Sequence, residues 1–192
     1  MMDRPDVIEL VRGIVSGIPD GLALRYPDGD EAYMDIPCPE LNYIFGSAQY
    51  IKDSLDTLGK TVPTTELKFP LVGLFTPIRE VHDSPDYFAR VSIDMVIACQ
   101  SRREWDNEKR KVSSFGNILR PICDRLIGGI LDDALHFDTG YDPFVSYELS
   151  ENYDYGRYGA YTDTGEEVSE PIDAINIRSL QLIVKNPNCR IR

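Results

Sequence analysis

The chain has few of the residues and motifs that mark the common catalytic and metal-binding classes. Its 192 residues include two histidines, one tryptophan and four cysteines, and no two cysteines form a CxxC pair. A structural zinc site needs clustered ligands, so we expect no metal and no other cofactor. Phosphate-binding glycine loops, the GxSxG nucleophile turn and the HExxH zinc motif are also missing. The sequence therefore predicts a protein that is not an enzyme.

Long apolar runs are missing as well. No run approaches the roughly 20 residues that a membrane-spanning helix needs. The first residues, MMDRPDVIELVRG, are acidic and periodic, and they lack the basic start and apolar core of a secretion signal. We therefore expect intracellular synthesis, no membrane association and no disulfides. Cys99 and Cys123 stand in apolar runs and are predicted to be buried free thiols.

Positive charge is scarce and unevenly placed. The formal net charge is −12, which argues against a surface that grips nucleic acid. Residues 102–120 hold six basic and three acidic side chains, whereas residues 124–173 hold 13 acidic and two basic ones. Segments of opposite charge can meet inside the fold or between identical neighbours. A plain solvated acidic surface is the third interpretation, and the sequence leaves all three open.

Two polar features are candidates for chemistry. His82, Asp83 and Asp86 form the one His-Asp cluster, and they could serve a metal-assisted hydrolase if another ligand came from elsewhere. A polar loop is the favoured interpretation. Asp94 lies inside an apolar run and would need a partner such as Arg178 if both faces of its strand were covered. An outward-facing position for Asp94 is the favoured alternative.

The order of apolar patterns predicts an α+β fold with a mixed or antiparallel sheet, in a single domain over residues 1–192. The expected elements are a helix over 5–17, a β-hairpin over 22–26 and 31–36, a helix in the second half of 41–59, strands over 68–75 and 87–99, a core helix over 115–130 and a final strand over 172–185. A phase slip in the last strand predicts a bulge or bend near Ser179. Residues 132–170 show little periodicity, so they are expected to form an extended arm or loop insertion, with a function or short strands of its own.

The sequence of the expected core helix, FGNILRPICDRLIGGI, contains a proline, which usually interrupts a helix. An apolar stripe continues across the interruption and consists of Phe115, Ile118, Leu119, Ile122, Leu126 and Ile130. Pro121 stands within this stripe, and an uncompensated proline inside a helix costs about 3 kcal/mol. We therefore predict a kink, or two helical pieces that meet between residues 117 and 120 and bend over the sheet.

Aromatic and basic residues mark a candidate interface with a neighbouring subunit or partner. The arm holds six of the eleven tyrosines, and tyrosine offers a large contact area with a polar tip. The only tryptophan lies in a charged loop. The interface candidates are Arg102, Arg103, Trp105, Arg110, Tyr153, Tyr155, Arg157 and Tyr158. The alternatives are a tyrosine-rich hairpin packed on its own sheet and a tryptophan that anchors its loop to its own core.

The order of these motifs resembles that of small neck proteins of tailed phages. The relevant features are KFPLVGLF, a strand ending in IAC, the Trp105 loop, ILRPICDRLI, YGRYG and the final IDAINIRSLQLIV. They are similar to proteins from phages and prophages of the Bacteroides group, including crAss-like phages. The hairpin, central sheet and packed helix also resemble the tail-terminator and head–tail-completion family. The resemblance covers residues 20–185 and rests on packing and turn motifs.

The resemblance implies a structural virion protein, made in the host cytoplasm, that forms a ring between portal and tail. Members of this group assemble as six-fold or twelve-fold rings, so the implied partners are further copies of the chain and the neighbouring portal, neck or tail proteins. DNA would pass through the ring without specific binding, which fits an acidic chain. The family brings no catalytic residues. An intracellular protein-binding module that uses the tyrosine-rich arm is the alternative function.

Overall fold

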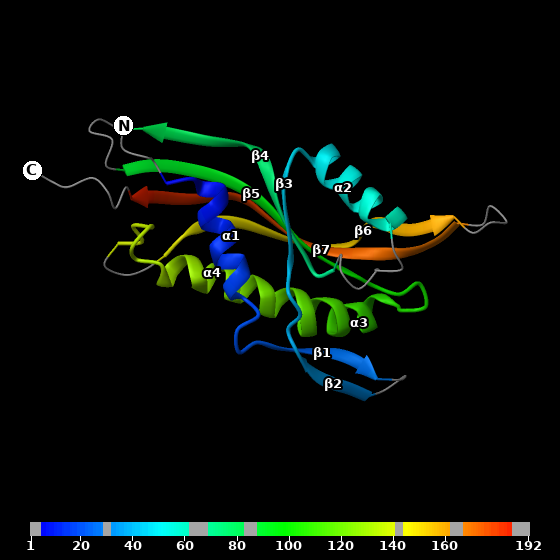
Figure 1. Cartoon of the computed structure of the whole chain (residues 1–192). Helices are drawn as coiled ribbons and strands as arrows, with labels where there is room; N and C mark the ends of the chain where they lie inside the picture. Colours follow the sequence, from blue (N-terminus) through cyan, green and yellow to red (C-terminus); the bar gives the residue numbers. More distant parts are fainter. Residues whose placement is uncertain are drawn as a thin grey trace, which may run out of the picture.

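The computed structural model describes residues 5–28, 32–61, 69–82, 88–140, 144–161 and 167–185. Over these residues the fold is α+β, as predicted from the sequence, with three helices, a two-stranded sheet and a five-stranded sheet (Figure 1). The strand order of the large sheet is β3-β4-β5-β7-β6. β3 is parallel to β4 and the other neighbours are antiparallel, so the sheet is mixed.

The N-terminal helix and the hairpin match the predicted pattern. Helix α1 (Val7–Gly17) begins after Asp6, whose side chain accepts a hydrogen bond from the N–H of Ile8 as an N-cap does. Strands β1 (Ala23–Asp28) and β2 (Ala32–Pro37) pair antiparallel and form the small sheet. β2 ends at a proline, as expected from its missing N–H.

The large sheet contains the three strands that the sequence predicted and two that it did not place. Its strands are β3 (Asn42–Gly46), β4 (Leu71–His82), β5 (Phe88–Gln100), β6 (Ser146–Tyr161) and β7 (Glu167–Lys185). β5 shows the expected alternation, and β7 has its predicted irregularity at Ser179, which has φ 52°. β4 continues well past the predicted end at residue 75 through a register shift before Arg79. The short strand β3 was not predicted, and helix α2 (Ala48–Thr61) follows it.

The core helix is continuous but changes its winding near the proline. Segments α3 (Asn107–Arg110), η2 (Lys111–Leu119) and α4 (Arg120–Asp132) follow one another without a gap, and η2 has π-helical hydrogen bonding. The predicted disturbance between residues 117 and 120 takes the form of this change from π to α winding. Pro121 follows η2, at whose end the N–H of Arg120 still donates to the carbonyl of Phe115 five residues back, and Pro121 itself donates no hydrogen bond to the preceding turn.

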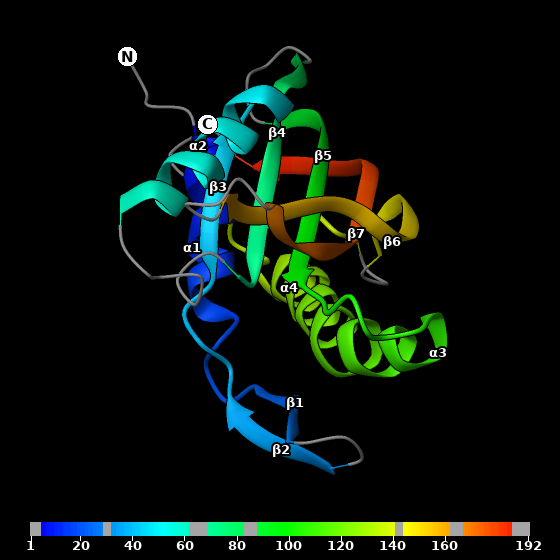
Figure 2. The same cartoon turned by 90° about the vertical axis from the view of Figure 1, so that its right-hand side faces the viewer.

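Helices cover both faces of the large sheet. On one face α1, η2 and α4 pack against alternate residues of β5 and β7 and form the main core, which includes Phe115, Leu126, Ile97 and Ile175. On the other face Ile51 of α2 packs in a smaller cluster with residues such as Val96 and Ala174. Figures 1 and 2 show α2 and α4 on opposite sides of the sheet. The predicted stripe of the core helix is buried throughout, from Phe115 to Ile130.

Much of the predicted arm is a strand of the sheet. β6 pairs with β7 from Ser146 to Tyr161, with register shifts on either side of residues 148–152. β5 pairs with β7 only as far as Ile172, so β7 residues before Pro171 have β6 as their strand partner. Residues 158–161 and 167–170 therefore form a two-stranded ribbon, named here the distal ribbon, which projects past the end of β5 (Figure 1).

Candidate interaction surface

A buried ion pair lies where the core helix meets the base of the distal ribbon. The guanidinium of Arg110 is 5% exposed and binds both carboxylate oxygens of Asp173, with Nε donating to Oδ2 over 3.1 Å and Nη2 donating to Oδ1. Asp173 is fully buried on β7. A second carboxylate, that of Asp154 on β6, lies 3.4 Å from Nη1. Burial lowers the pKa of Arg110, but the hydrogen bond and charge of Asp173 outweigh it and leave the pKa raised.

The same cluster fixes the turn of β6 at the base of the ribbon. The N–H of Asp154 donates to Oδ1 of Asp173 over 3.2 Å, and Asp154 has a left-handed φ of 57°. The ring of Tyr153 packs on Phe115 of the core helix, with 4.4 Å between ring centroids. The irregular stretch of β6 thus has contacts with Asp173 of β7 and with Arg110 and Phe115 of the core helix. We name Arg110, Asp154 and Asp173 the root cluster, because they bind one another at the base of the distal ribbon.

The basic and acidic segments of the sequence meet inside the fold. Arg110 and Arg120 belong to the basic segment, and both bind carboxylates of the acidic one. Arg120 binds Glu151 on β6 with distances of 2.6 and 2.9 Å. Within the described residues, these contacts show that the two segments pair in the same chain. Their opposite charges are therefore no evidence for a contact between neighbouring subunits.

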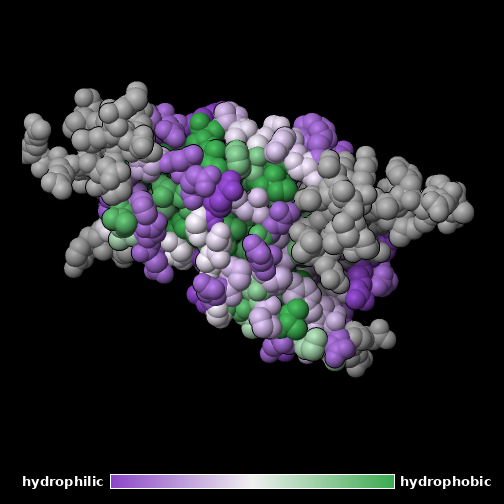
Figure 3. All heavy atoms as spheres, in the orientation of Figure 1, coloured by the Kyte–Doolittle hydropathy of each residue, from purple (hydrophilic) through white to green (hydrophobic). Residues whose placement is uncertain are grey.

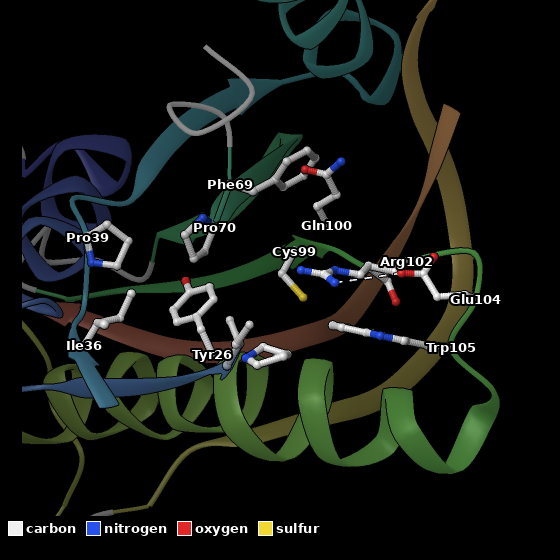
Figure 4. Close-up of a pocket in the computed structure, with 13 residues that line it drawn as sticks. Tyr26, Ile36, Pro39, Phe69, Pro70, Cys99, Gln100, Arg102, Glu104 and Trp105 are labelled. Atoms are coloured by element: carbon white, nitrogen blue, oxygen red, sulfur yellow. Dashed lines mark ion pairs between the residues drawn. The ribbon is translucent and has the colours of Figure 1, made fainter. Parts of the chain in front are cut away.

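A cavity of about 700 Å³ opens above η2, between the small hairpin and the end of β5. In Figure 4, Tyr26, Cys99 and Trp105 point into it from β1, β5 and the loop after β5. Trp105 is half-buried, and the guanidinium of Arg102 lies 5.4 Å from its ring centroid. Arg102 also lies 3.8 Å from Glu104. This arrangement places an aromatic side chain with a basic rim at the surface beside the core helix.

The buried thiols in the described part of the chain are poorly suited to nucleophilic chemistry. Burial raises the pKa of Cys99 at the cavity, and the nearby charge of Asp173 raises it further. Burial also raises the pKa of Cys123 to about 12. A thiol is nucleophilic as the thiolate, so both groups are inert at neutral pH. Cys38, Cys99 and Cys123 are free and buried, as predicted for the latter two.

The polar candidates have local partners. His82 lies 3.0 Å from Glu80, while Asp83 and Asp86 lie outside the described residues. In the described part of the chain, no group of three His, Cys, Asp or Glu side chains could hold a metal ion. Asp94 is exposed, as favoured from the sequence, and it accepts a hydrogen bond of 2.7 Å from the N–H of Ser179 at the bulge of β7.

The predicted interface residues occupy three different environments. Arg102 and Arg103 are exposed and Trp105 is half-buried in the loop before α3. Arg110 belongs to the buried root cluster, so its guanidinium is turned into its own chain. Tyr153 is half-buried and Tyr155 is exposed. The backbones of Arg157 and Tyr158 pair with β7, but their side chains lie outside the described part.

Sequence reasoning missed Asp173 and Asp154, the two carboxylates that hold Arg110. The available signal was an aspartate in the strongly apolar stretch IDAINI, which is a buried position if the strand is central. Exposed apolar side chains also occur on several elements, and Figure 3 shows hydrophobic and hydrophilic residues interspersed on one face. They include Met34, Phe45, Tyr50, Val81, Phe88, Val112, Leu135, Phe144, Leu149, Tyr155 and Ile183.

Neither the protein-family models nor the curated proteins give a match to this chain. Among the described helices, none is long and apolar enough to cross a membrane.

Proposed function

We propose that the chain is a structural virion protein that forms a ring in the neck of a tailed phage, between portal and tail. The proposal begins from the resemblance of its motif order to neck proteins. The structural observation that supports it is the distal ribbon, whose two strands leave the sheet beyond Pro171. In the ring, further copies of the chain are its first partners, and the flanking portal, neck or tail proteins are its second.

The physical argument concerns how a short ribbon is stabilised. A lone two-stranded ribbon is only marginally stable in water, and it gains stability by packing on another surface. A ring needs a heterologous interface, in which one surface of a subunit meets a different surface of the next. A projecting ribbon with a fixed root supplies the first surface. The exposed loop that carries Arg102, Arg103 and Trp105 is our candidate for the second.

The charge of the chain fits this role. DNA must slide through the ring without tight binding, and a chain with a net charge of −12 does not attract phosphate. The root cluster is compatible with the proposal because it fixes the ribbon before assembly, which reduces the entropy lost when subunits associate.

The test uses the full chain and one shortened variant. The wild type is examined by light scattering after gel filtration and by electron microscopy for closed rings. In the variant, residues 158–170 are replaced by an Asn-Gly turn, which leaves the root cluster and both cores in place. We expect rings from the wild type and monomers from the variant, with equal thermal stability of the subunit. A wild type that stays monomeric at high concentration, or a shortened variant that still closes rings, contradicts the proposal.

The same experiment distinguishes the ring-forming function from the alternative, a protein-binding module. An intracellular binding module that used the tyrosine-rich ribbon would form a complex with another protein and no ring. Loss of the ribbon would then abolish that complex while the mass of the purified chain stayed monomeric in both forms.

A further inference from the structure

The π winding of η2 decides which side chain of the core helix faces Asp173. Its backbone hydrogen bonds span five residues, as the bond from the N–H of Arg120 to the carbonyl of Phe115 shows. Because an α-helix spans four, π winding brings the residue five positions before Phe115 to the place where α winding would bring the residue four positions before it. These two residues are Arg110 and Lys111. The structure agrees, since Arg110 is buried against Asp173 and Lys111 is exposed.

The two ends of the core helix are held by different kinds of contact. Phe115 is fully buried, and the apolar stripe that follows it is buried as far as Ile130. Between residues 107 and 114 the buried side chains are all polar, namely Arg110, Ser113 and Ser114. A close-packed apolar core resists rotation of a helix, whereas a polar contact can be exchanged for an equivalent one. The segment before Phe115 is therefore the part of the helix that can turn.

A change from π to α winding would replace each contacting cation by the next one along the chain. Residues 109–111 are three consecutive cations, Lys-Arg-Lys. In the π winding, Nζ of Lys109 lies 5.0 Å from the ring centroid of Tyr33, and Arg110 binds Asp173. In the α winding, Arg110 would lie at Tyr33 and Lys111 would lie at Asp173. The buried carboxylate thus has a cation in both windings, and the change leaves no buried charge unpaired.

The two cations would not hold the distal ribbon equally. The guanidinium of Arg110 binds both carboxylate oxygens of Asp173 and also lies 3.4 Å from the carboxylate of Asp154 on β6. The ammonium group of a lysine is a point charge without this planar fork, so Lys111 would bind Asp173 and release Asp154. Asp154 stands at the base of the ribbon with a left-handed φ of 57°. Its release would loosen the turn from which the ribbon leaves the sheet.

The same end of the helix is attached to the loop that carries Trp105. α3 begins at Asn107, directly after its N-cap Asp106, whose side chain accepts a hydrogen bond of 2.8 Å from the N–H of Lys109. A rotation of α3 would therefore move residues 102–106 with it. This loop and the distal ribbon are the two surfaces assigned above to the ring contact. One helix end is thus joined to both of them.

We propose that the N-terminal end of the core helix is a two-state element, which changes between π and α winding and thereby couples the Trp105 loop to the distal ribbon. In the π state, Arg110 holds the root cluster. In the minor α state, Lys111 replaces it and the ribbon is free to fit a neighbour. A neighbouring copy that turns the loop shifts the equilibrium toward the α state. What the two surfaces bind rests on the proposed ring, but the change of winding is a property of the single subunit.

The test is NMR relaxation dispersion on the full chain, at a concentration below that of assembly. Shifts of helix register occur in microseconds to milliseconds, which this method detects. We expect one common exchange process for the amides of residues 107–115 and 153–157. Lys111→Met should lower the population of the minor state at least about tenfold, because the α state then leaves a buried carboxylate unpaired. Lys111→Arg should retain the exchange. Glu108→Gln is the control for the exposed ion pair of Lys111 with Glu108, at 3.9 Å, and should also retain it.

Urea unfolding of Arg110→Met, Lys111→Met and the double variant gives a second, independent measurement. Lys111→Met alone should change the equilibrium constant of unfolding less than about threefold, because its side chain is exposed. In the Arg110→Met background it should change that constant about tenfold or more, since Lys111 would then supply the cation for Asp173.

Additive effects in this cycle overturn the inference. It is also overturned if the helix and the base of the ribbon show no common exchange, or if Lys111→Met leaves the exchange unchanged. Ring formation is scored separately. Rings from a chain without the exchange would overturn the coupling alone, whereas the exchange in a chain that never forms rings would overturn the proposed ring and leave the change of winding.

Discussion

Breaking the buried pair between Arg110 and Asp173 is expected to destabilise the fold strongly. Arg110→Met keeps the length of the side chain but leaves the carboxylate of Asp173, which is fully buried, without its cation. Removing one partner of a buried ion pair costs about 3–5 kcal/mol. That loss is a large part of the roughly 5–15 kcal/mol that stabilises a typical domain. For a chain of this size it lowers the melting temperature by roughly 6–20 °C.

The assay is urea unfolding of the wild type, Arg110→Met, Asp173→Leu and the double variant. The double variant buries no unpaired charge, so it should be more stable than Arg110→Met, although the N–H of Asp154 loses its acceptor at a cost of about 1 kcal/mol. Arg120→Met is the matched control, because its pair with Glu151 is more exposed and should contribute less than about 1 kcal/mol. Equal losses in Arg110→Met and Arg120→Met, or additive losses in the double variant, would refute the reasoning.

Three further outcomes are expected. Gly129→Ala should lower stability by about 1–3 kcal/mol, because its Cβ would lie 2.7 Å from a side-chain carbon of α1. Gly128→Ala, where an added Cβ meets nothing within 4 Å, should instead raise stability by about 1 kcal/mol, and both are measured by urea unfolding. The folded pKa of Cys123 is raised from 9.0 to about 12, so stability from this neutral thiol is present below pH 9 and is lost as pH rises from 9 to 12. Cys123→Ala should flatten the pH dependence of urea unfolding in that window, and an unchanged slope counts against the assignment. Tyr33→Phe removes a 2.9 Å hydrogen bond to Ser113 of η2 and should lower thermal stability by about 1 kcal/mol, whereas an unchanged melting curve shows that the hairpin is held by other contacts.

Patterns within one segment predicted most of the fold. The alternation in β5 and the apolar stripe of the core helix each reflect burial of one face, which is visible at a fixed sequence period. The small hairpin was visible because turn-forming residues separate its two strands. The bulge at Ser179 was also visible, because the apolar phase shifts there. These predictions succeeded because the responsible interactions repeat along the same stretch of chain.

Features that depend on distant residues were not predictable in this way. The five residues of β3 form a strand because β4 offers a parallel edge, and so short a segment has no clear period. Arg110 and Asp173 are 63 residues apart, and the pairing of β5 with β7 together with the packing of the core helix on the sheet brings them together. Pro121 signalled a disturbance of the helix, but the sequence did not predict that the segment before it, η2, has π winding.

In the candidate interface, too, some features were visible in the local sequence and others depended on distant residues. Composition singled out Arg102, Trp105 and the tyrosine-rich segment, and these residues are at least partly exposed or lie on the edge strand. Composition alone could not tell that Arg110 turns inward while Arg102 stays at the rim of a cavity. Long-range strand pairing made that distinction, because β7 carries the buried carboxylate that draws Arg110 in.

The central claim is that this chain assembles into a closed ring through the distal ribbon. The most direct measurement is the mass and shape of the purified chain at high concentration, by light scattering and electron microscopy, with and without residues 158–170. We expect closed rings from the intact chain and monomers from the shortened one. A monomeric intact chain, or identical rings from both, would contradict it.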